Sequence, residues 1–266
     1  MSTTFAFLDS GTGGLPYLKY LKSFMPEVSC VYVGDTKNFP YGEKSREEII
    51  EKSLLCVSKI IKKWSPKAIV VACNTISVTA LEDFRKEFPN IPFVGTVPAI
   101  KPAAKLTKTK KIGLLATNAT VNNPYTKKLI SDFASDCKVF PLGAPELISF
   151  IEHKYYNSTF EERVCEAKKY CSFFVEKGCD VIVLACTHFL NMAEEIKVAA
   201  GKNITVIDSR DGVTRHAFDV VSKENLSLTK DVSSYLYVTG FTEYNDTERY
   251  ISFCNQNNIK FGGLLE

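Results

Sequence analysis

Two short segments decide the fold of this chain: Ile69-Val-Val-Ala-Cys-Asn-Thr75 and Ile182-Val-Leu-Ala-Cys-Thr187. Each is an aliphatic run that ends in Ala-Cys and a polar residue. Such a run is typical of a β-strand that is buried on both faces of a parallel sheet. Strand composition alone would not supply the same ending twice, so the two segments indicate an internal repeat.

A second pair of segments supports the repeat. Phe7-Leu-Asp-Ser-Gly-Thr12, followed by Pro16-Tyr17, aligns with Leu115-Ala-Thr-Asn-Ala-Thr120, followed by Pro124-Tyr125. The two alignments have similar offsets, 108 and 113 residues, and occur in the same order along the chain. We therefore predict two duplicated halves of the same architecture.

The rest of the chain alternates between short apolar runs and amphipathic stretches. We expect strands at 5–8, 30–33, 68–72, 92–95, 112–116, 181–185 and 205–207, and helices at 45–64, 78–88, 125–133 and 159–177. This alternation predicts an α/β fold with parallel sheets covered on both faces. The repeat places the changeover near Val97-Pro98, which predicts a first domain of residues 1–97 plus 209–266 and a second of residues 98–208.

The composition excludes several classes of protein. The 266 residues are 45% hydrophobic and 24% charged, which is enough to bury a core and too apolar for a disordered chain. The net charge is only +3, and Lys outnumbers Arg 27 to 6, so a nucleic-acid partner is not expected. The longest aliphatic runs are about a quarter of a membrane span, so a membrane partner is not expected either.

The nine cysteines need an explanation. Their number is odd, and the first residues have neither a basic region nor a long apolar run, so we expect a cytoplasmic protein with reduced thiols. No Cys-x-x-Cys pair occurs, and we expect no metal and no cofactor. Most of the nine should pack as small hydrophobic residues in the core.

Cys73 and Cys186 stand apart from the other thiols. Both directly follow a predicted strand, at the end of the sheet where α/β proteins bind ligands. The residues that follow, Asn74-Thr75 and Thr187-His188, can begin a helix, whose N-terminus favours a thiolate. Two thiols in equivalent positions suit removal of a proton from one face of a carbon and its return on the other, which inverts a stereocentre without a cofactor.

Three loops can bind a small anionic amino acid. In the Gly-rich loop from Asp9-Ser10 to Gly14, backbone N–H groups could approach a carboxylate, or the glycines could serve a tight turn alone. Tyr41-Gly42 permits a close approach of a ligand to the backbone, or is only a turn. Thr117 and Thr120 occupy the loop equivalent to Asp9, where they could bind a carboxylate or cap a helix.

The histidines and one acid complete the candidates. His188 is two residues from Cys186 and could polarise its thiol or transfer a proton. His153 and His216 have no comparable surroundings, and we expect them to be structural or exposed. Glu152 is ambiguous, because its local sequence alone would leave it on the surface.

In this order, the motifs resemble those of glutamate racemases, the cofactor-independent enzymes of bacterial peptidoglycan precursor synthesis. The resemblance is carried by residues 7–14, 34–42, 72–77, 95–98, 116–120, 185–188 and 208–209. It implies two pseudosymmetric α/β domains with the active site in the cleft between them, often in a homodimer. This chain departs from the family at Phe189-Leu190, where Tyr-Pro is common, which would alter the second-domain wall of the pocket.

The resemblance also implies residue roles. Cys73 would take the proton from D-glutamate, and Cys186 from L-glutamate. The substrate contacts would be Asp9-Ser10, Tyr41-Gly42, Asn74-Thr75 and Thr187-His188. Asp9, Glu152 and His188 match acidic and imidazole residues that assist the thiols in the family.

Three alternatives stay open. An aspartate or hydantoin racemase would share the same pair of thiols. A non-catalytic regulatory role, such as the gyrase inhibition known for some glutamate racemases, would be expected to add an N-terminal extension or a basic face. A thiol-redox protein would need Cys73 and Cys186 to form a reversible disulfide.

Overall fold

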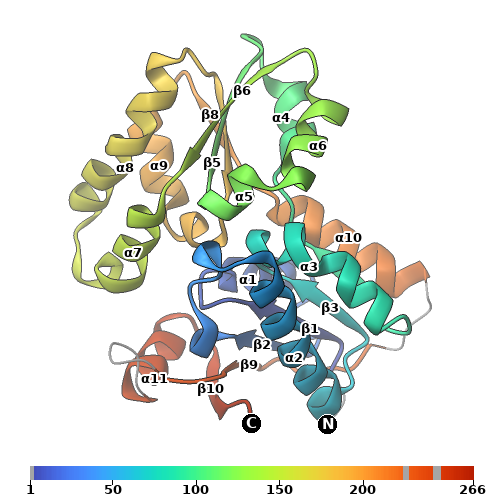
Figure 1. Ribbon diagram of the computed structural model, residues 1–266. Helices are drawn as coiled ribbons and strands as arrows, with labels where there is room; N and C mark the ends of the chain where they lie inside the picture. Colours follow the sequence, from blue (N-terminus) through green and yellow to red (C-terminus); the bar gives the residue numbers. More distant parts are fainter. Residues whose placement is uncertain (1–2, 224–227, 242–246) are drawn as a thin grey trace. The chain divides into compact units, whose positions relative to one another are not determined.

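The structure is a computed structural model that describes residues 3–223, 228–241 and 247–266 (Figure 1). The chain divides into two compact units. Unit 1 comprises Met1–Thr96 and Arg210–Glu266, and unit 2 comprises Val97–Ser209. Both units are of the α/β type with parallel sheets, which confirms the predicted fold class.

The sheet of unit 1 has the strand order β10-β9-β2-β1-β3-β4, and every neighbouring pair is parallel. Its strands are β1 (Phe5–Asp9), β2 (Cys30–Gly34), β3 (Ala68–Val71), β4 (Phe93–Gly95), β9 (Ser234–Val238) and β10 (Lys260–Leu264). The helices are α1 (Leu15–Phe24), α2 (Arg46–Trp64), α3 (Asn74–Glu87), α10 (Arg210–Lys223) and α11 (Thr247–Gln256), with short 3₁₀ turns η1 (Thr36–Asn38) and η2 (Tyr41–Glu43).

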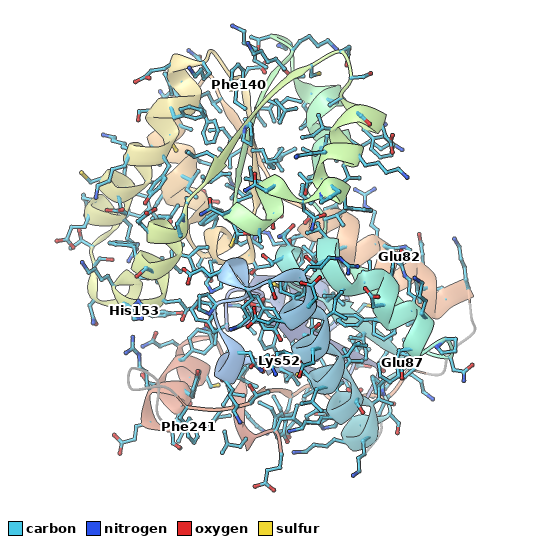
Figure 2. All side chains as sticks on the ribbon, in the orientation of Figure 1. Lys52, Glu82, Glu87, Phe140, His153 and Phe241 are labelled. Atoms are coloured by element: carbon cyan, nitrogen blue, oxygen red, sulfur yellow. The ribbon has the colours of Figure 1, made fainter. Side chains whose placement is uncertain are left out.

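Helices cover both faces of this sheet. The buried stripes of α2 and α3 pack on the strand face that carries Leu8, Val33 and Val71. The opposite strand face, with Phe5 and Phe7, is buried as well. Helices α1 and α10 pack against each other and contact strands β2, β3 and β4 of this sheet. The outer side of α3 is charged and exposed, as at Glu82 and Glu87 (Figure 2). Burial on both faces explains why the strands are continuous aliphatic runs.

Unit 2 has a parallel sheet with the order β6-β5-β7-β8. Its strands are β5 (Lys111–Ala116), β6 (Lys138–Gly143), β7 (Val181–Ala185) and β8 (Thr205–Ile207). The helices are α4 (Ile100–Leu106), α5 (Asn118–Asn122), α6 (Pro124–Phe133), α7 (Pro145–His153), α8 (Phe160–Glu176) and α9 (Ala193–Ala200), with 3₁₀ turns η3 (Tyr155–Asn157) and η4 (Thr187–Met192). Helices α8 and α9 lie on one side of the sheet, and α4 and α6 on the other (Figure 1).

The two sheets share one strand order. In unit 1 the strands β2-β1-β3-β4 follow the order that β6-β5-β7-β8 follow in unit 2. The first strand of each set in the chain is central, and the third strand lies beside it. Cys73 directly follows Ala72 after β3 and Cys186 directly follows β7, so the two thiols occupy topologically equivalent positions.

All seven predicted strands are present, but the sequence prediction missed β6, β9 and β10. Strand β6 lies at a sheet edge, is partly exposed and contains Pro141, which only an edge tolerates well. Helix α3 begins at Asn74 and not at 78, directly after Cys73. Among the described residues, no helix is both long and apolar enough to cross a membrane.

Two Gly→Ala substitutions should change stability in opposite directions. A Cβ at Gly113, within β5, would lie 2.5 Å from Cδ1 of the buried Phe174, so Gly113→Ala should destabilise the protein by about 1–3 kcal/mol. Gly212, in α10, has open space around its Cβ position, so Gly212→Ala should stabilise it by about 0.5–1 kcal/mol. Urea unfolding of both variants measures the difference, and equal midpoints would contradict the packing at Gly113.

Candidate functional site

The candidate residues fall into one group in each unit. Unit 1 holds Asp9, Ser10, Tyr41, Gly42, Cys73, Asn74 and Thr75, and unit 2 holds Thr117, Thr120, Glu152, Cys186, Thr187 and His188. Within each unit they gather at the carboxyl ends of the central strands or on the segment that follows.

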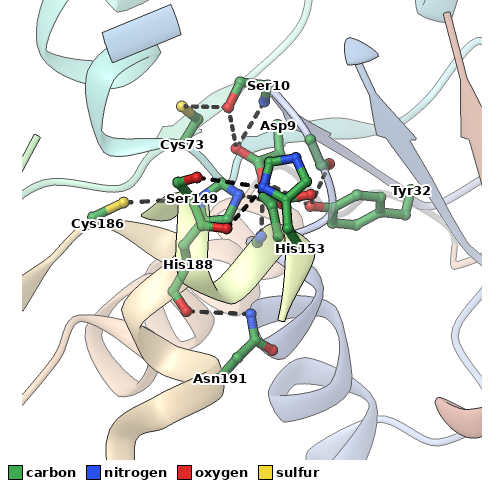
Figure 3. Close-up of polar contacts among 12 residues, drawn as sticks. Asp9, Ser10, Tyr32, Cys73, Ser149, His153, Cys186, His188 and Asn191 are labelled. Atoms are coloured by element: carbon green, nitrogen blue, oxygen red, sulfur yellow. Dashed lines mark hydrogen bonds and ion pairs between the residues drawn. The ribbon is translucent and has the colours of Figure 1, made fainter. Parts of the chain in front are cut away.

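In unit 1, a chain of polar contacts leads from Cys73 to Asp9 (Figure 3). The Cys73 thiol donates to Ser10 Oγ at 3.9 Å, and the Ser10 hydroxyl donates to Asp9 Oδ1 at 3.4 Å. Sheet register explains this proximity, because Leu8 pairs with Val71 and the next two residues of each segment lead to Ser10 and Cys73. Cys73 is also the N-cap residue of α3, where the helix dipole favours a thiolate.

The Asp9 carboxylate organises the Gly-rich loop. It accepts from the backbone N–H groups of Ser10 at 2.7 Å and Gly14 at 2.8 Å, and from the Tyr32 hydroxyl at 3.0 Å. Burial is the main cause that raises the pKa of Tyr32, and the adjacent Asp9 raises it further, so this hydroxyl remains a donor. A Cβ at Gly14 would lie 2.3 Å from the Ala72 carbonyl oxygen, so close packing requires glycine there.

Asn74 has the least satisfied side chain of this group. It is 2% exposed, and within the part of the chain that the structure describes neither its amide nitrogen nor its amide oxygen has a hydrogen-bond partner. Leaving such a group unsatisfied costs about 1–3 kcal/mol, which a ligand carrying a donor and an acceptor would offset. The neighbouring Thr75 is also buried.

A buried acid holds the loop that contains Tyr41-Gly42. Asp35 accepts from Tyr41 Oη at 2.5 Å, from Asn38 Nδ2 at 3.0 Å and from Thr239 Oγ1 at 2.6 Å. Burial is the main cause that raises the pKa of Tyr41, and the neighbouring Asp35 raises it further. The Tyr41 ring packs in the core of unit 1. The Tyr41 hydroxyl is therefore already engaged by Asp35, and its ring is part of the core.

In unit 2, an imidazole joins a thiol to a carboxylate. His188 Nδ1 lies 3.8 Å from Cys186 Sγ, and His188 Nε2 lies 2.6 Å from Glu152 Oε1. His188 is 3% exposed, and the side chain of Glu152 is 14% exposed. Glu152 lies on α7, and its local sequence suggested a surface position. The structure instead pairs it with His188.

The charge of His188 depends on these two neighbours. Burial by itself lowers the pKa of His188, but hydrogen bonds and charge interactions with Cys186 and Glu152 raise it, with a net value well above the usual range. A protonated imidazole beside a thiol favours the thiolate. The contacts therefore favour a protonated imidazole beside the Cys186 thiol.

The segment after Cys186 differs from the one after Cys73. Cys186 precedes the 3₁₀ turn η4 and not an α-helix, so the group beside its thiol is the His188 imidazole and not the N-terminus of an α-helix. Phe189 and Leu190 of this turn are buried. Thr187 is buried beside His188, and Thr117 caps α5 by accepting from the backbone N–H of Thr120 at 3.1 Å.

The other seven thiols lie in helices or at or just before the amino ends of strands. All nine cysteines are free, and seven of them are buried. Burial raises the pKa of Cys30, Cys171 and Cys254 to about 12, which keeps these thiols protonated at neutral pH. They behave as small core residues, as expected from the composition.

The other histidines lie outside both groups. His153, at the end of α7, and His216, in α10, are exposed. A groove of about 430 Å³ between α7 and α8 is lined by His153 but by none of the candidate residues. Within the described ranges, no cluster of His, Cys, Asp and Glu could hold a metal ion.

The sequence prediction missed two residues of these networks. Tyr32 and Asp35 lie on β2 and directly after it, beside β1 in the sheet. The position of Asp35 after a buried aliphatic strand was an available signal, of the same kind that singled out Cys73. Tyr32 lies inside a strand, where nothing distinguishes it from a core tyrosine.

The Glu152–His188 pair yields a prediction about pH. Because the pKa of folded His188 is raised, the pair stabilises the fold fully below the unfolded value of about 6.5 and loses this contribution as pH rises through the folded value. Glu152→Gln should lower the His188 pKa in an NMR titration. In urea unfolding, its stability deficit should be largest near pH 6 and shrink at higher pH.

Glu146→Gln, on the exposed first turn of the same helix, is the matched control. It should leave the His188 titration unchanged. A Glu152→Gln deficit that did not vary with pH would contradict the charged pairing.

Comparison with known proteins identifies relatives along most of the chain. A family model described as Asp/Glu/Hydantoin racemase matches residues 18–217. The glutamate racemase of Proteus mirabilis (strain HI4320) is 39% identical over 247 residues, covering 91% of this chain and 84% of that protein. The glutamate racemase of Treponema pallidum (strain Nichols) is 37% identical over 263 residues, covering 98% and 96%.

Solved structures agree with this relationship. Escherichia coli glutamate racemase, in complex with L-glutamate and the activator UDP-MurNAc-ala, has a TM-score of 0.87 at 29% identity and covers 99% of this chain and 98% of its own. Francisella tularensis glutamate racemase, in complex with D-glutamate, has a TM-score of 0.78 at 26% identity, covering 99% and 96%. The resemblance expected from the motifs is thus confirmed: the chain belongs to the Asp/Glu/hydantoin racemase family and is an isomerase of the racemase type.

Proposed function

We propose that this protein is a cofactor-independent glutamate racemase that interconverts L- and D-glutamate by proton transfer between two thiols. The enzyme would act in the cytoplasm, and the D-glutamate that it forms would be used for peptidoglycan. The observation that carries the proposal is the equivalent placement of Cys73 and Cys186 after β3 and β7, each with its own polar partners. Relatives named glutamate racemase, 37–39% identical over most of the chain, support this substrate over aspartate or a hydantoin.

The unit 2 half of the reaction would start from the Cys186 thiolate. The imidazolium of His188 stabilises this thiolate, and Glu152 stabilises the imidazolium. The thiolate takes the α-proton of L-glutamate and becomes a neutral thiol. A general base poised in this way contributes about 100-fold or more to the rate.

The unit 1 half would return a proton to the opposite face of the α-carbon. Cys73 gives up its proton to form D-glutamate and is left as a thiolate at the N-terminus of α3. In the reverse direction Cys73 removes the proton of D-glutamate. Ser10 and Asp9 would orient the thiol through the contacts at 3.9 and 3.4 Å.

Substrate binding would use the polar groups that the fold leaves available. The unpartnered Asn74 amide can donate to a carboxylate and accept from the α-ammonium group. Ser10, the backbone of Tyr41-Gly42, and Thr75, Thr117, Thr120, Thr187 and His188 would complete the contacts, as the family resemblance implies. Hydrogen bonds to the α-carboxylate would stabilise the carbanion in a site that excludes water.

The arrangement of the chain enters the proposal as well. Residues 1–97 plus 209–266 and residues 98–208 would act as two domains with the substrate in the cleft between them. Closure of the domains over the substrate would remove water from the reacting carbon. We also propose a homodimer, which sedimentation of the purified protein would test.

Reaction in deuterium oxide tests the mechanism. Because the proton that one thiol removes is not the one that the other thiol delivers, newly formed product should carry deuterium while recovered substrate keeps its hydrogen. A single-base mechanism would put deuterium into the recovered substrate as well, or carry the substrate's own hydrogen to the product. Mass spectrometry of each separated enantiomer at early times measures this.

Cysteine variants test the two thiols. Cys73→Ala and Cys186→Ala should each lower racemisation at least about 100-fold, because each removes one acid–base group. Cys165→Ala, at an exposed thiol, is the matched control and should keep full activity. Full activity in either of the first two variants would overturn the two-thiol mechanism.

The substrate and the absence of a cofactor are tested together. Purified protein should racemise L-glutamate faster than L-aspartate or a hydantoin. Dialysis against a chelator, or treatment with hydroxylamine to remove any pyridoxal phosphate, should leave the rate unchanged. Faster turnover of aspartate would assign the chain to a different activity within the same family.

A further inference from the structure

Arg163 makes an unusual set of contacts in unit 2. It lies in the first turns of α8, and its side chain is 18% exposed. Its Nε donates to Glu195 Oε1 at 2.7 Å. Its Nη1 donates to the backbone carbonyls of Tyr155 at 3.2 Å and Ser158 at 2.8 Å.

These partners belong to the two segments that carry the Glu152–His188 contact. Glu195 lies in the first turn of α9, which directly follows η4, the turn that contains His188. Tyr155 is the first residue of η3, and Ser158 directly follows this turn. One residue separates η3 from α7, the helix that contains Glu152. Arg163 therefore connects both segments through one guanidinium group.

The geometry of this connection requires arginine. The guanidinium uses one edge for a carboxylate and another nitrogen for two carbonyl oxygens, and it also lies 4.6 Å from the centre of the Tyr155 ring. A lysine ammonium is a compact charge and cannot make this planar set of contacts. Glu195 is 4% exposed, so Arg163 also compensates a buried charge.

The contact between Glu152 and His188 is short and joins two separate elements. Glu152 Oε1 and His188 Nε2 are 2.6 Å apart, although they lie 36 residues apart in the chain and on different elements. No strand pairing fixes α7 relative to η4. A side-chain contact of this kind needs support to within about 0.5 Å from the residues around it.

We propose that Arg163, together with Glu195, is a positioning residue that holds Glu152 against His188 and so maintains the acid–base state of Cys186. For its effect on turnover, this inference rests on the proposed racemase function. For its effect on His188, it stands on the contacts of unit 2 alone.

The test replaces the ion pair without leaving a buried charge. Arg163→Met alone would strand the Glu195 carboxylate, so the main variant combines Arg163→Met with Glu195→Met, since apolar replacement of a buried pair is often neutral for stability. Arg163→Lys is the second variant, because it keeps the charge beside Glu195 and loses the contacts with the carbonyl groups.

Two measurements follow. The first is an NMR titration of the histidine side chains in the full chain without substrate, which is practicable because the sequence has three histidines. The titratable neighbours that shift His188 are Cys186 and Glu152, and neither is changed in these variants. We expect the His188 pKa to fall in the double variant and, by a smaller amount, in Arg163→Lys. The second is steady-state racemisation, for which we expect kcat to fall about 10-fold with little change in KM.

The matched control is Arg85→Met combined with Glu82→Met in unit 1. Arg85 also pairs with a glutamate, at 2.8 Å, and donates to a backbone carbonyl, that of Phe93, at 3.3 Å. The described contacts of this pair are with residues of unit 1, so the control should leave both the titration and kcat unchanged.

The outcomes separate the possible roles. An unchanged His188 titration in the folded double variant would overturn the inference even if activity fell, because a merely structural role would not move that pKa. If the double variant does not fold, Arg163→Lys decides by the same titration. If the protein racemises no glutamate, the proposed function fails while the titration still decides the role of Arg163.

Discussion

The parallel register between each central strand and its neighbour is the constraint on which the candidate site depends. In unit 1 the pairing of Leu8 with Val71 carries on to Ser10 and Cys73. In unit 2 the pairing of Ala116 with Ala185 carries on to Thr117 and Cys186. Parallel strands end at the same edge of a sheet. The backbone hydrogen bonds between the strands therefore position the residue that directly follows each strand. The thiols are therefore positioned by the sheets, before any side-chain contact is made.

Equivalent positions do not give the two thiols equivalent surroundings. The Cys73 thiol donates to the Ser10 hydroxyl, which donates to the Asp9 carboxylate, and Cys73 caps the N-terminus of α3. Cys186 meets an imidazole with a carboxylate behind it, at the start of a 3₁₀ turn. In the proposed reaction the two thiols meet opposite faces of a chiral substrate, so nothing requires their surroundings to match. The repeat explains where the thiols lie, and the residues between the repeated strands explain why their polar partners differ.

What could be predicted from the sequence follows the same division. The aliphatic strands, both thiols, Asp9 and His188 are recognisable because each signal is local: a strand, its end, and the residues that follow. The pairing of Glu152 with His188 depends on how α7 packs against η4, and no periodicity reports that. Strand β6 escaped prediction because an edge strand needs neither full burial nor the absence of proline. Contacts between distant elements are the part that local patterns do not encode.

Buried acids occur in both kinds of position: Asp9 and Asp35 lie at the ends of strands, and Glu195 lies on a helix. A buried ion pair is weak evidence for stability, because apolar residues of similar volume often stabilise a fold equally well or better. The Arg163–Glu195 pair lies between segments that no strand register fixes, whereas Cys73 and Ser10 are aligned by the sheet itself. Directional contacts at fixed angles have their largest effect where backbone pairing does not already determine the geometry. The proposed orienting role of the Arg163–Glu195 pair fits this position, whereas sheet register already aligns Cys73 with Ser10.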